Sequence, residues 1–204
     1  KILNDQLQSM KFSEFVTLTR SDLYRHSGSA GLKDHLYHYL LSPGYRYTCW
    51  MRFCAYTQAH PFWRILFPFA WLVYYHLQIK FGIAISFKAK IGPGLYIGHH
   101  GGIVTNEEMQ IGKNCNLSHD VTIGVSRRGE RAGVQVIGNN VYIGPGAKIF
   151  GKITIGNNAA IGANCVVTKD IPENGVVVGI PGKVISYEGS AGYINRVFVE
   201  KEQQ

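Results

Sequence analysis

Aliphatic residues recur at every sixth position over much of the chain between Ile85 and Ile171. A period of six fits neither the 3.6-residue turn of an α-helix nor the two-residue repeat of an ordinary strand. It is typical of a hexapeptide repeat, in which three units close one triangular coil and successive coils stack into a prism. The series comprises Ile85, Ile91, Ile97, Ile103, Ile111, Leu117, Ile123, Ile137, Ile143, Ile149, Ile155, Ile161 and Val167.

The residues around each aliphatic support this prediction. A small or aliphatic residue usually stands four positions later, and glycine often follows directly, as in Ile143-Gly144 with Ala147. We therefore predict a mainly β protein, a single-stranded left-handed parallel β-helix over residues 83–185. A small helical domain over residues 1–82 precedes it, and a polar C-terminal tail over residues 186–204, irregular or a short helix, follows. An α/β sheet is disfavoured because the helices it needs between strands are missing.

The segment before the repeat, residues 1–82, lacks the period of six and carries apolar residues at helical spacing. Ser21 and Asp22 predict a helix start, and Ser42-Pro43-Gly44 predicts a stop. A second helix is expected from Tyr47 to Tyr56, and Pro61 then separates it from a third apolar run.

That third run, residues 62–77, is rich in aromatic and aliphatic side chains. It is shorter than the roughly 20 apolar residues of a membrane span, and Arg64 and Pro68 interrupt it. We expect a helix that packs on the β-helix or on a neighbouring subunit. The alternative is peripheral contact with a membrane, because aromatic residues flanked by basic ones suit the bilayer interface.

Composition indicates a folded chain with an anionic partner. The 204 residues are 46% hydrophobic and 17% charged, with a formal net charge of +8. A membrane surface or a phosphate-rich cofactor would suit that charge, whereas the scattered basic residues and the lack of a binding motif argue against nucleic acid. No signal peptide is apparent, so we expect a cytoplasmic protein, with the inner membrane face as the alternative.

The cysteines are expected to be structural. Cys115 and Cys165 occupy the small position of their hexapeptide units, where a buried thiol acts as a compact hydrophobe. No Cys-x2-Cys pair is present, which argues against structural zinc.

Two irregularities in the repeat mark candidate sites, because the interior of a closed prism is filled. One is the unit from Ile97 to Gly102, which carries His99 and His100. The other is an insertion at residues 124–133 that carries arginines. Loops that leave a rigid scaffold are where binding residues usually collect.

Several segments resemble the serine acetyltransferase family of the hexapeptide-repeat acyltransferases. The first is Gly92-Pro93-Gly94-Leu95-Tyr96-Ile97-Gly98-His99-His100-Gly101-Gly102-Ile103-Val104. Val121 to Gly124, Val141 to Ile149 and Val177 to Val184 also resemble that family, so the match covers about residues 82 to 186.

The resemblance implies acetyl transfer from acetyl-CoA to a hydroxyl, with His99 at the family's catalytic histidine. Histidine is suited to take the hydroxyl proton near neutrality, and attack on the thioester would be direct. No metal is implied, and the His-x4-His pair of a hexapeptide zinc site is missing. Such prisms typically form homotrimers, which a helical part could extend to a dimer of trimers.

The departures from the family bear on the acceptor. Its Asp-Ile-His-Pro segment is Ala84-Ile85-Ser86-Phe87 here, the aspartate before its catalytic histidine is Gly98, and its carboxylate-binding Arg-His pair is Gly133-Val134. These losses favour an acceptor hydroxyl on a sugar or on surface or capsular polysaccharide, as in an offshoot of the family. The alternatives are serine O-acetylation in cysteine biosynthesis and a non-catalytic hexapeptide scaffold.

Spacing places some candidates together. His99 and His119 each follow an aliphatic by two positions, so we expect them to be axial neighbours, with Asp120 beside His100. The carboxylate that orients His99 is left open between Glu107, Asp120 and Glu108. The candidate catalytic residues are His99, His119, Glu107 and Asp120; the cofactor-binding ones are Pro145, Ala163, Lys169 and Lys183; and the substrate-binding ones are His100, Arg127, Arg128 and Arg131.

Overall fold

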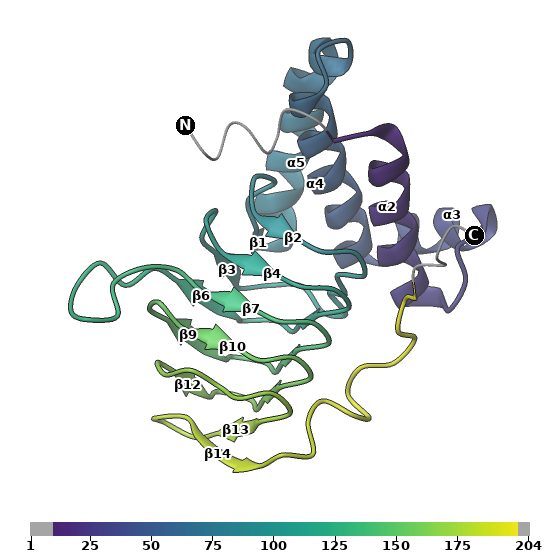
Figure 1. Cartoon of the computed structure of the whole chain (residues 1–204). Helices are drawn as coiled ribbons and strands as arrows, with labels where there is room; N and C mark the ends of the chain where they lie inside the picture. Colours follow the sequence, from purple (N-terminus) through teal and green to yellow (C-terminus); the bar gives the residue numbers. More distant parts are fainter. Residues whose placement is uncertain (1–9, 200–204) are drawn as a thin grey trace.

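The computed structural model describes residues 10–199 and shows helices stacked on one end of a prism (Figure 1). The helical elements are α2 (Phe12–Ser27), α3 (Leu32–Leu41), α4 (Pro43–Ala59), the 3₁₀ helix η1 (Trp63–Leu66) and α5 (Phe67–Phe81). The strands are β1 (Ile83–Ala84), β2 (Lys90–Ile91), β3 (Ile103–Thr105), β4 (Gln110–Ile111), β5 (Asn116–Leu117), β6 (Thr122–Gly124), β7 (Val136–Ile137), β8 (Tyr142–Ile143), β9 (Lys148–Phe150), β10 (Thr154–Ile155), β11 (Ala160–Ile161), β12 (Val166–Val167), β13 (Val176–Val178) and β14 (Lys183–Ser186).

The strands form three sheets, one for each face of the prism. Their orders are β1-β3-β6-β9-β12, β10-β7-β4-β2 and β14-β13-β11-β8-β5, and every strand pairing is parallel except that of β13 with β14. Ile149 pairs with Val167 and Ile143 with Ile161, so the partner of each lies three hexapeptide units further along the chain. The left-handed parallel β-helix predicted from the repeat is confirmed.

The interior is a continuous stack of the repeated aliphatic side chains. Ile123, Ile149 and Val167 lie directly above one another in one sheet, and all three are buried. The core extends without a break into the helices through Leu77 and Phe81 of α5. Each coil therefore stabilises the next, and the helices cover the open end of the stack.

The register corrects one detail of the expected series. Ile103 pairs with Ile83, and it is Thr105 that pairs with Ile123, so Ile103 occupies the small position rather than the repeated aliphatic one. The offset that joins Ile83 to Ile103 is two positions longer than the regular offset that joins Val104 to Thr122. The extra pair of residues lies within residues 98–102, which we call the histidine corner.

The corners of the prism require left-handed backbone at fixed positions. At the histidine corner and its equivalents in later coils these are Gly102, Asp120, Gly146 and Asn164, with φ values of 66°, 57°, 71° and 56°. A Cβ at Gly102 would also lie 1.9 Å from Asp120 Oδ1, so a side chain there would displace the Asp120 carboxylate. Asparagine and aspartate tolerate this conformation better than other side chains.

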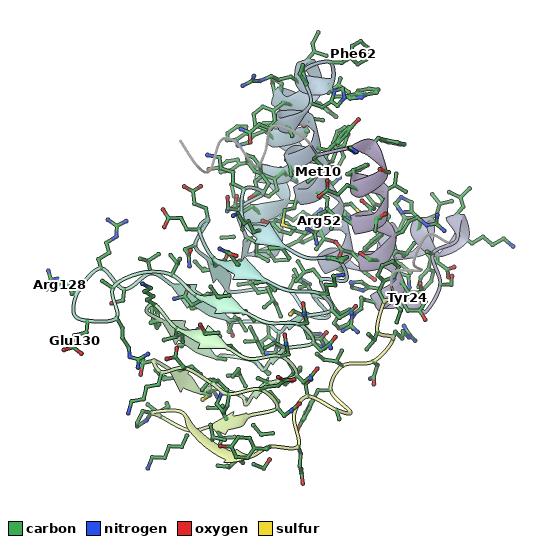
Figure 2. All side chains as sticks on the ribbon, in the orientation of Figure 1. Met10, Tyr24, Arg52, Phe62, Arg128 and Glu130 are labelled. Atoms are coloured by element: carbon green, nitrogen blue, oxygen red, sulfur yellow. The ribbon has the colours of Figure 1, made fainter. Side chains whose placement is uncertain are left out.

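The second insertion leaves the prism between β6 and β7. Ile123 pairs with Ile149, and this offset is eight positions longer than that of a regular coil. The buried Gln135 closes the base of this loop, since its Nε2 donates to the Gly124 and Gly151 carbonyl oxygens at 2.7 and 2.8 Å. Figure 2 shows Arg128 and Glu130 at the end of the loop, away from the prism.

Helix α2 contradicts the predicted helix start. Ser21 and Asp22 lie in the middle of α2 and are buried. Their side-chain oxygens do accept backbone N–H groups, but those of Gly94 and Leu95 in the first coil, at 2.9 and 2.8 Å. These two side chains therefore join α2 to the β-helix. The predicted stop is confirmed, because α3 ends at Leu41.

A buried ion pair completes this junction. Arg52 of α4 donates from Nε to Asp22 Oδ2 at 3.1 Å, and its terminal nitrogens donate to the Ile91 and Gly92 carbonyl oxygens at 2.7 and 2.8 Å. Both side chains are almost fully buried. Figure 2 shows Arg52 between the helices and the first coil.

Helix α5 packs one face and exposes another. Ala70, Tyr74 and Leu77 are buried at helical spacing, against α4 and the start of the β-helix. Phe69, Leu72 and Ile79 are more than half exposed along the other side, and so is Ile65 of the preceding η1. Within residues 10–199, no helix has both the length and the apolar character to cross a membrane.

The chain after β14 is irregular and returns along the prism to the helices (Figure 1). Ser190 donates to the Asn140 carbonyl oxygen at 2.6 Å, and Tyr193 stacks on Tyr142 with centroids 4.6 Å apart. Phe198 exchanges hydrogen bonds with the Asn114 side chain at 2.9 and 3.1 Å. The tail therefore covers one face of the coils.

Replacing Asp22 with Asn should lower the free energy of unfolding by about 3 kcal/mol, because breaking a buried pair leaves Arg52 with an uncompensated charge. Urea unfolding followed by circular dichroism measures this. The matched control is Asp34→Asn, since Asp34 forms no ion pair among the described residues, and it should change stability little. Equal effects of the two replacements would contradict the role given to the pair.

Candidate active site

The histidine corner brings two predicted catalytic residues together. The β-bridge between Tyr96 and Asn116 fixes the register there, so His99 lies one coil away from His119. Their ring centroids are 6.0 Å apart and the rings are nearly perpendicular. His99 is exposed and His119 is half-buried.

The other two members of the expected cluster lie at the same corner but face different neighbours. The His100 ring packs against Phe81 of α5, with centroids 5.6 Å apart. Asp120 lies against Gly102 rather than beside His100, because the two extra residues shift the register, and its N–H donates to the Gly101 carbonyl oxygen at 2.8 Å. Asp120 thus has a clear structural role as the left-handed residue of the turn.

A cavity of about 710 Å³ opens beside His99, between one face of the prism, α2 and the C-terminal tail. Its walls carry two cations and a set of aromatic and polar groups. They are Arg25, Tyr96, Gly98, His99, Asn116, Leu117, Ser118, Tyr142, Gly192, Tyr193, Asn195 and Arg196. The cavity therefore places a histidine and two guanidinium groups around one space.

Arg25 is the most deeply buried cation of this cavity, with only 3% of its surface exposed. Its terminal nitrogens donate to Asn116 Oδ1 and the Asn195 carbonyl oxygen, and its guanidinium lies 5.8 Å from the centre of the Tyr96 ring. Burial lowers the pKa of this guanidinium from its ordinary value. The site thus holds a desolvated positive charge.

The neighbouring His26 is held neutral. Its ring lies 4.6 Å from that of Tyr96, and burial, with the nearby His38 and Arg25, lowers the pKa of His26 to about 3. A second positive charge beside Arg25 is thereby avoided at neutral pH.

The glycine before His99 has a local explanation. A Cβ at Gly98 would lie 3.0 Å from the Tyr96 ring, so that ring occupies the space a side chain at this position would need. Glycine at position 98, where the family has an aspartate, therefore leaves room for the ring of Tyr96, which lines the cavity.

The predicted glutamates do not lie at His99 within one chain. Glu107 pairs with Lys88 at 3.9 Å and lines a separate cavity of about 530 Å³ with Ala84 and Ser86. Glu108 is exposed in the same turn. Among residues 10–199, His99 has no hydrogen bond or ion pair to a carboxylate.

Three of the four predicted cofactor residues follow the corner of His99 along the prism axis. Leu117, Ile143 and Ile161 are in register, so Pro145 and Ala163 stack beneath His119, and Asn164 N–H donates to the Pro145 carbonyl oxygen at 2.8 Å. Lys183 pairs with Val178 at the last coil of the same corner. Lys169 lies at the next corner, beyond β12.

The loop arginines are not brought to His99 in one chain. Arg127, Arg128 and Arg131 leave the prism between β6 and β7, which is a different corner from that of His99. Arg131 pairs with Asp170 at 3.2 Å. Arg127 and Arg128 are exposed, and Figure 2 shows Arg128 pointing away from the prism.

The buried cysteines have the environment of structural residues. Burial raises the pKa of Cys115 to about 12, which leaves it a protonated core residue. Over the part of the chain that the structure describes, no group of three His, Cys, Asp or Glu side chains has the arrangement of a metal site.

Sequence reasoning missed the cavity residues of α2 and the tail, Arg25, Tyr193, Asn195 and Arg196. A polar face of α2, formed by Ser21, Asp22 and Arg25 at helical spacing, was the only signal for Arg25. The tail offered none, because its position depends on hydrogen bonds to coils far away in the sequence.

Comparison with known families agrees with the fold. Residues 136–169 match the family "Bacterial transferase hexapeptide (six repeats)". A serine acetyltransferase from Synechococcus elongatus is 40% identical over 108 residues, which cover 53% of this chain and 44% of that protein. One from Staphylococcus aureus is 44% identical over 110 residues, covering 53% and 51%. The chain spans about half the length of the curated relatives it matches.

Solved structures extend the similarity over the helices. Serine acetyltransferase from Neisseria gonorrhoeae in complex with serine has a TM-score of 0.69 and 28% identity, covering 91% of this chain and 74% of that one. The enzyme from Brucella abortus in complex with coenzyme A has a TM-score of 0.69 and 26% identity, covering 86% and 69%.

These comparisons contradict the sugar or polysaccharide acceptor expected from the sequence, because the relatives and structures named above are serine acetyltransferases. The expectation rested on Ala84-Ile85-Ser86-Phe87, on Gly98 and on Gly133-Val134 in the loop. It treated the loop as the source of the carboxylate-binding cation, whereas the structure places Arg25 of α2 in the cavity beside His99.

The lowered pKa of His26 predicts a loss of stability in acid. The folded state keeps the imidazole neutral, whereas the unfolded chain takes up a proton below about pH 6.5, so stability falls as the pH drops from about 6.5 towards 3. Between pH 7 and pH 5 the wild type should lose about 2 kcal/mol more than His26→Phe. Urea unfolding at both pH values measures this difference. The exposed control His76→Phe should keep the wild-type pH dependence; if His26→Phe keeps it too, the assignment is wrong.

Proposed function

We propose that this chain, which matches the hexapeptide-repeat transferases over residues 136–169 and serine acetyltransferases over about half of its length, transfers the acetyl group of acetyl-CoA to the hydroxyl of L-serine or a close hydroxy amino acid. The observation that carries the proposal is the corner at His99. A histidine at the family's catalytic position lies at the edge of a cavity large enough for a small acceptor, and positions suited to the co-substrate continue along the same corner.

In the proposed reaction His99 takes the proton of the acceptor hydroxyl as its oxygen attacks the thioester carbonyl carbon. The resulting tetrahedral oxyanion expels the coenzyme A sulfur, and the proton on His99 passes to that thiolate. His119 would support His99 from the neighbouring coil, where the two ring centroids are 6.0 Å apart. Ser118 and Asn116 supply polar groups on the same wall of the cavity.

The co-substrate would lie along the corner below His99. Pro145 and Ala163 are small residues stacked under His119, and Lys183 adds a cation at the far end. A coil rises roughly 4.8 Å, so three coils give about the length of an extended pantetheine arm. The coenzyme A bound by the Brucella abortus enzyme supports this assignment of co-substrate.

A homotrimer would complete the site. The exposed loop arginines Arg127 and Arg128 lie at a different corner from His99, and Figure 2 shows Arg128 pointing away from its own prism. Three prisms packed side by side around a threefold axis would bring this loop of one chain towards the histidine corner of the next. The arginines would then contact the acceptor or co-substrate from the neighbouring subunit.

We further propose that the exposed face of η1 and α5 contacts an anionic membrane surface. Phe62, Ile65, Phe69 and Leu72 are all at least 60% exposed, and Figure 2 shows Phe62 at the end of the molecule farthest from the prism. The sequence between Asp34 and Glu107 contains no acidic residue. Its basic residues are Arg46, Arg52, Arg64, Lys80, Lys88 and Lys90. Arg52 is buried in its ion pair with Asp22, whereas Arg64 of η1 and Lys80 of α5 are exposed. An apolar face beside these two positive charges suits anionic lipid headgroups.

Catalysis by His99 predicts that His99→Gln lowers kcat by about a hundredfold or more while KM for L-serine changes little, because a general base contributes roughly that much. Thiol release from acetyl-CoA measures the rate. His76→Gln, at an exposed position outside the cavity, is the matched control. Turnover by the wild type that survives His99→Gln would refute this role, and no turnover with any hydroxy amino acid would favour a non-catalytic scaffold.

Membrane contact predicts that the double replacement Ile65→Asp and Phe69→Asp lowers binding to vesicles of phosphatidylglycerol and phosphatidylcholine about tenfold, because two apolar side chains no longer insert. Co-sedimentation measures the bound fraction, which should also fall with added salt. The control is Leu36→Asp on the exposed face of α3. If the double replacement changes only the oligomeric state, the face contacts a second copy and the proposal is wrong.

A further inference from the structure

The cavity beside His99 receives cations from two separate segments of the chain. Arg25 comes from α2, and Arg196 comes from the C-terminal tail that forms the outer wall. These segments lie near opposite ends of the sequence and meet at this cavity, where Arg196 donates to the His26 carbonyl oxygen. Neither residue matches a functional position implied by the family resemblance.

The charge of Arg25 has no counter-ion in its surroundings. Its hydrogen bonds go to the neutral oxygens of Asn116 and Asn195, and its buried Nε has no partner. The nearest acidic residue on α2, Asp22, is bonded to Arg52 and to Leu95. Within residues 10–199, no carboxylate forms an ion pair with Arg25. Such burial is costly unless a ligand supplies the missing charge.

The second guanidinium is held in place by the tail. Tyr193 stacks on Tyr142, and the Tyr193 carbonyl oxygen accepts a hydrogen bond from Asn116 Nδ2 at 3.2 Å. Arg196 follows with left-handed backbone, at φ 56°. The Arg196 side chain is exposed and forms no ion pair within the described part of the chain. It can therefore approach a ligand that Arg25 already holds.

We infer that Arg25 and Arg196 bind the carboxylate of the acceptor and thereby turn its hydroxyl towards His99. This inference rests on the proposed function. A guanidinium presents two parallel N–H donors to a carboxylate, and the interaction is strong where water is excluded. The pair would replace, from α2 and the tail, the carboxylate-binding residues that are missing at Gly133-Val134.

The first test compares two acceptors on the wild-type protein. L-Serinamide keeps the hydroxyl and the amine of L-serine but lacks the negative charge. The site should prefer L-serine by about a hundredfold in kcat/KM, because without the carboxylate Arg25 stays uncompensated. Equal kcat/KM values for the two acceptors would overturn the inference and leave the proposed acetyl transfer intact.

The second test uses variants that remove one charge each. Arg25→Gln and Arg196→Gln should raise KM for L-serine at least tenfold, leave KM for L-serinamide unchanged and change kcat less than KM. Arg20→Gln, on the exposed face of α2, is the matched control. Equal losses with both acceptors in Arg25→Gln would show a structural role only. Because that variant loses bonds to Asn116 and the tail, the exposed Arg196→Gln keeps the test valid if Arg25→Gln unfolds.

Calorimetric titration separates this inference from the proposed function. L-Serine should bind the wild type in the presence of coenzyme A, and Arg25→Gln should weaken that binding at least tenfold. If L-serine binds in this way but no acetyl group is transferred, the carboxylate site is supported and the proposed acetyl transfer is wrong. If Arg25→Gln instead weakens coenzyme A more than dephospho-coenzyme A, the anion is a cofactor phosphate and the carboxylate assignment is overturned.

Discussion

Backbone hydrogen bonds between coils fix the length of a regular coil at three hexapeptide units, and the site follows from this constraint. Each N–H and carbonyl on a face must meet its partner in the next coil, so any residues beyond those three units are expelled at a corner. The chain does this twice, with two extra residues at the histidine corner and eight in the loop after β6. The rest of the prism is filled by Ile123, Ile149 and their equivalents, which leaves chemistry only at its edges.

The helices reach the site because of the junction with the first coil. Arg52 and Asp22 bond to the backbone at Ile91, Gly92 and Leu95, which fixes α2 along one edge of the prism. One turn further along α2, Arg25 then reaches Asn116 in the next coil. The tail completes the cavity by stacking on the same face. The cavity therefore combines a rigid floor of coils with walls from both ends of the described chain.

The sequence predicted the elements that depend on local periodicity. A period of six has one geometric solution, so the β-helix and the proximity of His99 and His119 follow from counting. The sequence pattern could not predict features that depend on contacts between distant segments. Ser21 and Asp22 have the residue types of a helix cap, yet each bonds to a coil 73 positions away. The predicted register of Ile103 was wrong because the strand pairing between coils decides where the two extra residues of the histidine corner are placed.

The same limit explains why the acceptor predicted from the sequence was wrong. The loss of a cationic pair at Gly133-Val134 excludes a carboxylate only if that loop is its one source of positive charge. The walls of the site come from several segments, and a guanidinium on any of them can supply the positive charge. A carboxylate is bound by the charges and hydrogen-bond donors around it, whatever their order in the chain. Arg25 is such a group, desolvated and without a counter-ion among the described residues. A residue replaced at one corner therefore changes the acceptor only when no other wall compensates.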